Sequence, residues 1–433
     1  MDCHEDQLAG SLKALVIGAG WAGLAAAVRL VQGGAKVTLW DMAPQAGGRA
    51  RSWQDASGHW LDSGQHILIG AYRDTLALMR EVGANPEALM HRMPLTLVDA
   101  QGQGLRWGSG GPATAALQGV WRHAGWGWPE RLGLMRWGAG LLMRGLRCPA
   151  DWSVARLCRG LPAAVRLELA EPLCVAALNT RLEEASATVF LRVLRDALLG
   201  GPGAADLLLP RAPLQALLPD PALRWLEQRG VTAEFGRRAV TLTKAGLQWS
   251  CNDWEGDAIV LATSAVEAQR LAAPLNPNWA ARANSLTSEA IATVDLQASN
   301  FALAAPMVAL RGGPAQFLFD LGQIGGAPGR FVAVASAVAA ELEAGLEPLA
   351  QAIEAQVAAQ VPGLAGAPRL RAHADRRATF ACHTHLMRPP AAIAPGLWAA
   401  GDYVDGPYPA TLEGAVQSGS AAARWALGTI RPS

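Results

Sequence analysis

The chain has 433 residues with a formal net charge of +1, and 51% of them are hydrophobic. This length exceeds one ordinary domain and predicts two or three, while the balanced charge gives no reason to expect nucleic-acid binding. No stretch approaches 18 uninterrupted apolar residues, which argues against a transmembrane helix, and the polar start of the chain does not resemble a secretory signal.

A glycine-rich turn opens the recognisable part of the chain. Lys13–Ile17 is predicted to form a short buried strand, followed by Gly18-Ala-Gly20-Trp21-Ala22-Gly23 and an alanine-rich helix over 24–31. The first glycine permits a tight turn, the second lets the backbone approach a pyrophosphate, and the third lets helix and strand pack closely. The phosphates would meet unpaired N–H groups at the start of the helix. The turn therefore predicts a dinucleotide site.

A carboxylate follows the second predicted strand, over 36–40. Asp41 lies 23 residues beyond Gly18, close to the roughly 20-residue offset of the acidic residue that binds an adenosine ribose. A carboxylate at this place would repel the 2′-phosphate of NADP, so NADP is disfavoured. Gly47, Gly48 and Arg49 follow and supply a second glycine turn with a cation.

Tryptophans crowd the segment 107–152. The chain has 16 tryptophans and 3 tyrosines, and six of the tryptophans lie here: Trp107, Trp121, Trp126, Trp128, Trp137 and Trp152. Over 121–146, apolar residues such as Leu132 and Leu142 are interleaved with arginines, as in a basic amphipathic helix. This arrangement suits a membrane surface, and it equally suits a buried helix pair of a substrate-binding domain. The sequence leaves both interpretations open.

The centre of the chain is predicted to be mainly helical to about residue 210 and mixed beyond it. A helix is expected over 182–199, ended by Gly200-Gly-Pro-Gly203. Further elements are expected as strands at 231–235, 239–243, 247–251, 258–262, 291–296 and 331–335, and as a helix over about 347–361.

The last part of the chain carries the second half of a flavin-type fingerprint. A strand near 396–400 ends on Gly401-Asp402, and Thr411-Leu412-Glu-Gly414-Ala415 opens a final helix that runs to about 427. Together with the N-terminal turn, this motif predicts that two distant pieces of chain bind one FAD. The large middle of the chain is then free to hold a substrate.

The predicted fold is α/β: a Rossmann-like FAD-binding domain, discontinuous in sequence, with an inserted substrate-binding domain of mixed sheet plus helices. The FAD-binding domain is expected from 12–75, 211–270 and 371–433. The substrate-binding domain is expected from 76–210 and 271–370, and it includes the Trp-rich segment 107–152.

No metal site is expected. The six cysteines are scattered without a Cys-x-x-Cys pair, which indicates reduced thiols in a cytoplasmic protein. His383 and His385 would share one face of a strand, but the sequence offers them no companion ligands.

The fingerprint, the spacing from Asp41 to Arg49 and the C-terminal motif resemble the superfamily of flavin amine oxidases and carotenoid desaturases. Within it, the chain resembles the hydroxysqualene dehydroxylases, the squalene-associated FAD proteins of bacterial hopanoid synthesis. Four blocks carry this narrower resemblance, which runs over essentially the whole chain: 59–73 with Asp62-Ser-Gly64-Gln65-His66 inside it, 179–186, 190–196 and 206–213. The flavin motifs alone identify only the superfamily.

The resemblance implies where FAD would lie. The phosphate loop corresponds to Gly18, Gly20 and Gly23 with Trp21 and Ala22, the ribose carboxylate to Asp41, and the pyrophosphate-side arginine to Arg49 beside Gly48. The other implied contacts are Val240 at the adenine, Gly401 and Asp402 at the ribityl chain or pyrophosphate, Thr411, Leu412 and Ala415 at the pyrimidine edge, and Gly64, Gln65 and His66 over the flavin ring. The dipole of the final helix would stabilise negative charge at the N1–O2 edge of reduced flavin.

One position distinguishes the subfamilies. Amine oxidases as a rule enclose the substrate amine between two aromatic side chains, one of them just before the final helix. Thr411 occupies that position here, and Tyr408 stands three residues earlier. The motif therefore resembles the carotenoid-desaturase version, which implies an isoprenoid substrate in a long apolar tunnel.

The resemblance also implies a reaction. Hydroxysqualene, an allylic secondary alcohol, would lose its hydroxyl group while its carbon gains hydride from reduced flavin, and the departing hydroxide needs a proton. His66 is the first candidate for the acid, Asp62 for orienting it, Gln65 for binding the hydroxyl, and Tyr408 is in reserve. Structural roles stay open: a contact in the flavin loop for His66, and a turn carboxylate capping backbone amides for Asp62.

Three other functions stay open. A desaturase or isomerase of carotenoid precursors would share the fold, the flavin and the tunnel. An amine oxidase would produce peroxide from amines. A prenyl-binding escort protein would need no redox chemistry and could dispense with Asp402. The expected location is the cytoplasm, with peripheral contact of 121–146 to the inner face of the cytoplasmic membrane as an open alternative. No motif identifies the electron donor.

Overall fold

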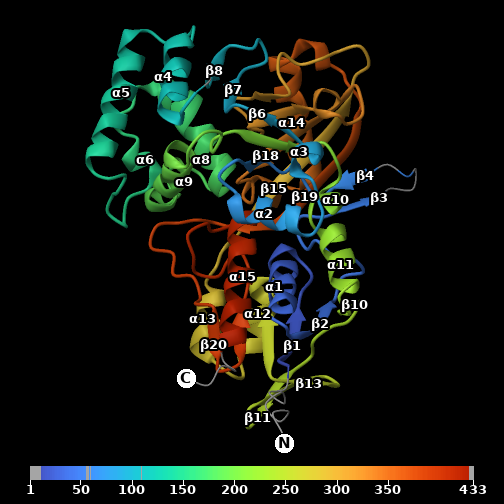
Figure 1. Cartoon of the computed structure of the whole chain (residues 1–433). Helices are drawn as coiled ribbons and strands as arrows, with labels where there is room; N and C mark the ends of the chain where they lie inside the picture. The colour runs from blue at the N-terminus through green and yellow to red at the C-terminus, as the bar shows by residue number, and fades with distance from the viewer. Residues whose placement is uncertain (1–10, 55–57, 59, 109, 429–433) are drawn as a thin grey trace, which may run out of the picture.

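Two β-sheets, one above the other in Figure 1, form the framework of the molecule. The computed structural model describes residues 11–54, 58, 60–108 and 110–428. The polar start of the chain, with Cys3, lies outside these residues. In the part of the chain that is described, no helix has both the length and the apolar composition needed to cross a bilayer.

The lower sheet has six strands in the order β10-β2-β1-β14-β21-β20, of which the first five are parallel. Their bounds are β1 Lys13–Ile17, β2 Lys36–Asp41, β10 Thr232–Phe235, β14 Ala258–Leu261, β20 Ala392–Ala394 and β21 Leu397–Ala399. The central strands read as continuous apolar runs because helices cover both of their faces. The strands come from all three segments expected to build the nucleotide-binding half.

Two helices far apart in sequence pack against each other beside this sheet (Figure 1): α1 (Trp21–Gln32) and α15 (Leu412–Gly428). A Cβ added at Gly419 would lie 2.0 Å from the carbonyl oxygen of Ala22, so only a glycine permits this approach. Helices α10 (Leu214–Leu217), α11 (Pro219–Glu227) and α2 (Arg73–Glu81) complete this half.

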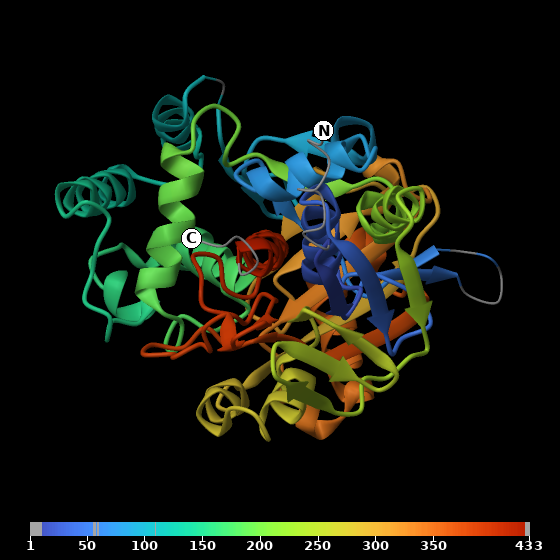
Figure 2. The same ribbon diagram turned by 60° about the horizontal axis from the view of Figure 1, so that its bottom comes forward.

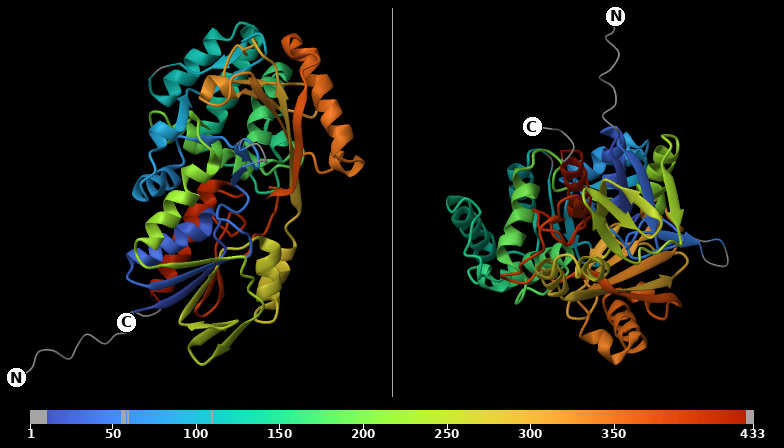
Figure 3. Two further views of the ribbon diagram at one scale, coloured as in Figure 1. Left: turned by 90° about the vertical axis from the view of Figure 1, so that its right-hand side faces the viewer. Right: turned by 90° about the horizontal axis from the view of Figure 1, so that it is seen from below.

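The upper sheet is antiparallel, in the order β16-β17-β18-β15-β19. Its strands are β15 Ser288–Gln297, β16 Met307–Ala309, β17 Phe317–Asp320, β18 Arg330–Ser336 and β19 Arg369–Phe380. Helix α14 (Leu346–Gln360) covers one face through Ile353 and its neighbours. Figure 3 shows α14, in orange, outside this sheet, with the rest of the molecule on the sheet's other side.

A helical lobe stands beside the upper sheet (Figures 1 and 2). It contains α4 (Pro112–Arg122), α5 (Trp128–Met143), α6 (Val154–Leu157), α7 (Ala163–Val165), a π-helical turn over Arg166–Ala170, α8 (Glu171–Leu178) and α9 (Ala187–Leu199). Helix α5 lies at the outer edge, and of its 16 residues only Leu141 is buried. The tryptophans of this region divide: Trp126 is buried, Trp107, Trp137 and Trp152 are half-buried, and Trp121 and Trp128 are exposed.

Short elements complete the structure. They are β3 Ser52–Gln54, β4 Trp60–Asp62, β5 Leu68–Ile69, β6 Met90–Met93, β7 Thr96–Val98, β8 Gly104–Arg106, β9 Leu207–Pro210, β11 Leu242–Ala245, β12 Gln248–Cys251, β13 Trp254–Gly256, α3 Pro86–Leu89, α12 Ala265–Ala272 and α13 Pro277–Asn284. The mixed α/β class, with a Rossmann-like half and a second sheet flanked by helices, is the fold that the sequence predicts.

Several predicted elements differ from the structure. The helix expected from 182 begins at Ala187, because Asn179 adopts a left-handed conformation that ends α8 and a turn follows. The strand expected from 239 begins at Leu242. His383 and His385 lie beyond the end of β19, outside any strand of more than one residue. The boundary expected at 370/371 falls at the start of β19, which pairs with β15 in the upper sheet.

Candidate functional site

A cavity of about 750 Å³ lies at the carboxyl ends of the parallel strands and continues along the upper sheet. Ligands of open α/β sheets bind at this edge. Fifteen of the residues expected to contact FAD or substrate line the cavity: Gly18, Gly20, Trp21, Ala22, Asp41, Gly48, Arg49, Gly64, Gln65, His66, Gly401, Asp402, Thr411, Leu412 and Ala415. Four expected residues do not line it: Gly23, Asp62, Val240 and Tyr408.

The glycine turn is held too tightly for side chains. Gly18 has a φ of +109°, and a Cβ there would lie 2.4 Å from the carbonyl oxygen of Ala262. A Cβ at Gly23 would lie 1.7 Å from the carbonyl oxygen of Gly18, so Gly23 packs the helix onto the turn and does not face the cavity. Gly20 faces Gly48 across open space, with its Cβ position 3.7 Å from the Gly48 Cα. The two glycine turns thus form a cradle of bare backbone, as phosphate binding requires.

Asp41 joins this cradle to the second strand. Its carboxylate accepts hydrogen bonds from the backbone N–H of Ala19 at 2.6 Å and of Ala43 at 2.7 Å. The Arg237 guanidinium lies 3.9 Å from the ring centre of Trp40, and its backbone N–H donates to the Asp41 carbonyl at 2.9 Å. Asp41 therefore lies on the cavity wall, beside the glycine turns.

The adenine contact expected at Val240 lies outside the cavity. Val240 is exposed, its N–H donates to Asn252 Oδ1 at 3.1 Å, and its carbonyl accepts from Arg270 at 2.8 Å. The three residues before it, 237–239, line the cavity instead. The later start of β11 explains the difference, because this stretch is an irregular connection that runs past Asp41 and Ala43.

An ion pair joins an early and a late part of the chain inside the cavity. Arg49 donates to the carboxylate of Asp402 and, at 2.9 Å, to the carbonyl of Ala378. The nearby Asp402 charge raises the pKa of Arg49 above its ordinary value. The side chain of Asp402 is 7% exposed, so its charge depends on this partner.

The first turn of α15 faces the same cavity. Thr411 Oγ accepts from the N–H of Gly414 at 2.9 Å and caps the helix. Glu413 points away from the cavity and accepts from Thr75 Oγ at 2.7 Å and from two backbone N–H groups of α2. Burial raises the pKa of Glu413. The helix N-terminus is left free to face a negatively charged group.

His66 lies on the loop that follows β4. Its Nδ1 is 2.8 Å from the carbonyl oxygen of Gly64, and because a carbonyl only accepts, Nδ1 carries the hydrogen. Burial lowers the pKa of His66. The neutral ring therefore has its lone pair on Nε2, and a second proton would be held at that atom.

The Asp62 side chain connects neighbouring elements of the fold. Its carboxylate accepts from Ser52 Oγ and from the N–H of Leu214 at 3.2 Å, which ties β4 to β3 and to the start of α10. Burial raises the pKa of Asp62. Over the described residues no hydrogen bond joins Asp62 to His66, and the carboxylate bonds instead to one hydroxyl group and one backbone amide.

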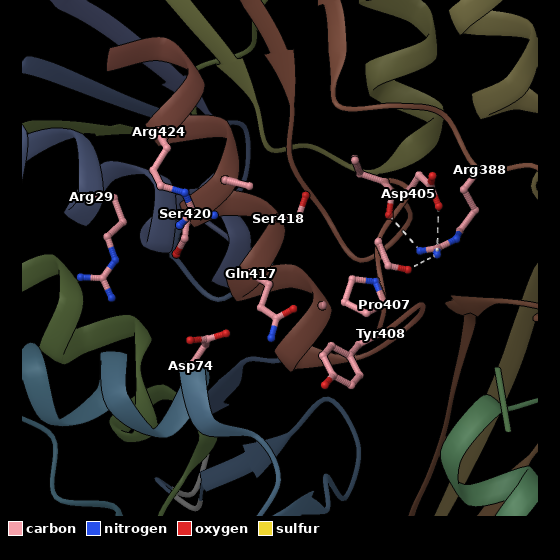
Figure 4. Close-up of a pocket in the computed structure, with 14 residues that line it drawn as sticks. Arg29, Asp74, Arg388, Asp405, Pro407, Tyr408, Gln417, Ser418, Ser420 and Arg424 are labelled. Atoms are coloured by element: carbon pink, nitrogen blue, oxygen red, sulfur yellow. Dashed lines mark hydrogen bonds and ion pairs between the residues drawn. The ribbon is translucent and has the colours of Figure 1, made fainter. Parts of the chain in front are cut away.

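Tyr408 lines a separate polar cavity of about 380 Å³, on the far side of the first turn of α15 (Figure 4). This second cavity also contains Arg424, Gln417 and the Arg388–Asp405 pair. Burial raises the pKa of Tyr408 to about 12, and the nearby Asp196 carboxylate adds to this rise. The side chain is thus outside the cavity that holds His66.

Two of the polar side chains that line the cavity without having been expected from the sequence come from β19. His373 and Asp375 are two residues apart on β19, so they share one face of the strand, and both line the cavity. His373 packs edge-on against Trp53 at 6.2 Å, and burial lowers the pKa of His373. The negative charge of Asp375 acts on both His66 and His373. It partly offsets the lowering of their pKa values by burial. Alternation of charged residues over 369–377 was the available signal for this strand.

A further part of the cavity wall is apolar. Its residues come from the upper sheet, from α8, from α12 and from the loop after His66: Ile67, Ala176, Ala177, Leu271, Ile291, Phe317, Phe319 and Val334. Alternate residues of β15, β17 and β18 thus face the cavity, while their neighbours face α14. One cavity therefore combines a dinucleotide cradle with space for a hydrocarbon.

No metal-binding arrangement occurs among the described residues, where no three His, Cys, Asp or Glu side chains are grouped to hold an ion. Five cysteines are free thiols, and burial raises the pKa of Cys158 to about 12. The cradle, the ribose-type carboxylate and the Arg49–Asp402 pair suit a flavin-type dinucleotide cofactor.

The comparisons with known proteins agree with this geometry. The NAD(P)-binding Rossmann-like domain family matches residues 16–82. The chain is 30% identical to hydroxysqualene dehydroxylase from Rhodopseudomonas palustris, over 96% of this chain and 98% of that protein. It is 28% identical to hydroxysqualene dehydroxylase from Sinorhizobium fredii, over 95% and 97%. A probable zeta-carotene desaturase from Synechococcus elongatus matches at 38% over only 21% of this chain and 19% of its own.

Solved structures share the fold. An oxidoreductase from Methanosarcina mazei superposes with a TM-score of 0.72 and 16% identity, covering 95% of this chain and 99% of its own. Cyclohexylamine oxidase from Brevibacterium oxydans gives a TM-score of 0.69 and 16% identity, with coverage of 97% and 99%. At this identity the likeness concerns the arrangement of the chain and not its substrate.

Proposed function

The chain belongs to the hydroxysqualene dehydroxylase family, and from this membership we propose that it reductively removes the hydroxyl group of hydroxysqualene to give squalene. The relationship spans 96% of the chain, so it includes the residues of both sheets. One observation carries the proposal: a single cavity joins the dinucleotide cradle to apolar walls built by the upper sheet. In the cell the reaction serves squalene synthesis, and hopanoid formation is the expected destination of the product.

FAD is the proposed cofactor. Gly18, Gly20 and Gly48 offer backbone to its pyrophosphate, Asp41 its carboxylate to the ribose, and the first turn of α15 its N–H groups to the flavin ring. When bound and reduced, the flavin supplies the hydride that takes the place of the hydroxyl group. Asp402 and Arg49 would lie between the pyrophosphate and ribityl regions.

The chain itself has to supply a proton and keep water out. Loss of the hydroxyl group as water requires one proton at the oxygen. His66 is the proposed donor, with the proton held at Nε2, because Nδ1 is fixed by the Gly64 carbonyl. His373 with Asp375 is the second candidate, since both groups line the same cavity. Gln65 is proposed to bind the substrate oxygen, and Phe317 and Phe319 to exclude water from the carbon chain.

The proposed location is the cytoplasm. The free thiols support this location, because five unpaired cysteines suit a reducing compartment.

Other functions receive less support. The zeta-carotene desaturase match is confined to about a fifth of the chain. Thr411 lies on the cavity wall where amine oxidases carry an aromatic side chain, which argues against an amine substrate. The Arg49–Asp402 pair within the cavity argues against an escort protein that does no redox chemistry.

An anaerobic incubation tests the proposal. Purified protein with photoreduced FAD is mixed with hydroxysqualene, and squalene is quantified while flavin absorbance is followed. One squalene should form for each flavin oxidised. Phytoene with oxidised flavin serves as the comparison: a desaturated product from phytoene and no squalene from hydroxysqualene would contradict the proposal. A purified protein that is colourless and takes up no FAD would contradict the cofactor assignment as well.

A further inference from the structure

Helix α5 presents an apolar stripe to solvent. Trp128, Leu132, Met135, Ala139 and Leu142 are spaced by four, three, four and three residues, so they lie along one side of the helix. Trp128, Leu132 and Leu142 are 60%, 55% and 59% exposed. A surface helix usually turns polar residues outward.

The opposite side of α5 is apolar as well. Trp137 and Leu141 pack inward, and the Trp137 indole N–H donates to the Leu157 carbonyl at 2.9 Å. A helix with large apolar side chains on two opposite sides is normally enclosed by other structure. Helix α5 instead lies at the outer edge of the molecule in Figures 1 and 2, with its outward stripe uncovered.

Helix α4 extends the same kind of surface. Leu117 and Trp121 lie one turn apart and are 53% and 51% exposed. Trp121 meets Trp128 edge-to-face, with 5.5 Å between the ring centres. Two exposed tryptophans in contact are unusual on a protein surface facing water, and tryptophan is enriched where apolar and aqueous phases meet. We call the exposed side chains of Leu117, Trp121, Trp128, Leu132, Leu142 and Met143 the α4–α5 face.

Unpaired arginines surround this face. Arg122, Arg136, Arg144 and Arg147 are exposed, and none forms an ion pair with a residue that the structure describes. Glu130 is the only acidic residue between 121 and 147, and its carboxylate accepts from the Gly127 N–H at 2.9 Å. The chain as a whole has a net charge of only +1, so the positive charge here is a local concentration.

We propose that the α4–α5 face docks on the surface of a lipid bilayer with anionic headgroups. The tryptophans, leucines and Met143 enter the boundary between headgroups and acyl chains, and the four arginines bind lipid phosphates. Helix α5 has 16 residues and is therefore about 24 Å long, shorter than the hydrocarbon core of about 30 Å, so it lies along the surface and does not cross it.

The charges favour a bilayer over a second copy of the chain. In a twofold contact the same face meets itself, so the four arginines of each copy would approach those of the other. Anionic lipid offers the opposite sign at every contact. Each such arginine adds to the attraction at a membrane that is rich in anionic lipid.

Vesicle flotation tests the docking and needs neither substrate nor reduced flavin, so its outcome is independent of the proposed reaction. The full-length FAD-loaded protein is floated with vesicles of phosphatidylglycerol and phosphatidylcholine, and with phosphatidylcholine alone. We expect flotation with the anionic vesicles that falls as salt is raised. The double variant Leu132→Ser/Leu142→Ser should bind anionic vesicles at least about tenfold more weakly.

Matched controls exclude general effects. Leu247→Ser removes a leucine that is 89% exposed, in the turn between β11 and β12 at the opposite end of the molecule from α5 (Figure 1), and should float as the wild type does. Arg136→Gln/Arg144→Gln should lose the preference for anionic lipid, whereas Arg224→Gln, also exposed, should keep it. Unchanged melting temperatures show that these surface variants are folded.

Two results would overturn the proposal. One is a wild-type protein that floats with neither kind of vesicle. The other is binding that the serine and glutamine variants leave unchanged. If light scattering then shows a dimer that Leu132→Ser/Leu142→Ser converts to a monomer, the α4–α5 face is an interface between copies of the chain.

Discussion

Arg49 and Asp402 are 353 residues apart in sequence, yet their side chains form an ion pair on the wall of the main cavity. Arg49 follows the second glycine turn, and Asp402 follows the last parallel strand, β21. The pair closes the cavity between the first and last parts of the nucleotide-binding half. The free energy of unfolding and the affinity for the cofactor are therefore both expected to depend on this ion pair.

Breaking this pair should destabilise the protein. Arg49→Met leaves the Asp402 carboxylate, 7% exposed, without its partner. Because the Arg49 side chain is itself 42% exposed, we expect a loss of about 1–2 kcal/mol with a fall of a few degrees in Tm. The double variant Arg49→Met/Asp402→Leu should recover part of the loss, because the isolated charge is gone. Calorimetry of the FAD-free proteins measures the cycle, with Arg224→Met as the surface control. Additive effects of the two substitutions would show that the side chains are not coupled.

Gly20→Ala should separate cofactor binding from folding. The added methyl group would lie 3.7 Å from Gly48 Cα, an ordinary contact, but on the cavity wall where a phosphate would approach. We expect an unchanged Tm for the FAD-free protein and at least about a 100-fold rise in the Kd for FAD. Gly138→Ala, with no neighbour within 4 Å, is the control and should bind FAD normally. A yellow Gly20→Ala protein with wild-type FAD content would exclude this place as the phosphate cradle.

The pH dependence should identify His66. Because burial lowers its pKa, the ring is mostly neutral at pH 7, and the protonated fraction grows as the pH falls. If His66 donates the proton, the rate of flavin oxidation by hydroxysqualene should rise about tenfold per unit of falling pH and level off below pH 6.5. Stability should fall over the same range, since the unfolded chain binds that proton more readily.

His66→Gln should remove this rise and leave the FAD content unchanged. His385→Asn is the control, because His385 is exposed at a φ of +59°, which asparagine tolerates. A His66→Gln enzyme with the rate and pH profile of the wild type would remove His66 from the reaction.

The second candidate pair makes a different prediction. The Asp375 charge raises the pKa values of His66 and His373 in part, so Asp375→Asn should shift the rise in rate toward lower pH. His373→Gln should lower the rate by about 100-fold or more only if His373 is the proton donor. Asp151→Asn, on the surface of the helical lobe, is the control. Stopped-flow measurement of flavin oxidation distinguishes these results from altered FAD binding.

The nucleotide-binding half could be predicted from the sequence because the motifs that indicate it are local. Continuous apolar runs predict the parallel strands, and a glycine whose Cβ would meet backbone at 2.4 Å marks the turn after β1. Strand Lys13–Ile17 has the predicted bounds, and α15 begins at the predicted residue. The agreement has a physical reason, because few backbone conformations accommodate a pyrophosphate.

The substrate-facing half could be predicted less well from the sequence, because the positions of its side chains depend on residues that are distant in sequence. Strand β19 carries His373 and Asp375 toward the cavity, and such a polar strand has no apolar alternation to reveal it. Tyr408 is close in sequence to Thr411, yet the first turn of α15 places the two side chains in different cavities. Val240 lies one residue beyond the stretch that reaches the cavity. Sequence patterns place the ends of elements only to within a few residues, so they do not detect such a difference.

The order of strands in the lower sheet has a consequence for biosynthesis. Strand β1 is translated early, but β14, its neighbour, is complete only at Leu261, and β21 only at Ala399. A ribosome that adds about 5–20 residues per second needs roughly 20–80 s to reach β21 after β1. During that interval the glycine turn has emerged without the wall that faces it. Flavin loading is therefore an event that follows translation of nearly the whole chain, and the nascent apolar strands are the part that chaperones would have to shield.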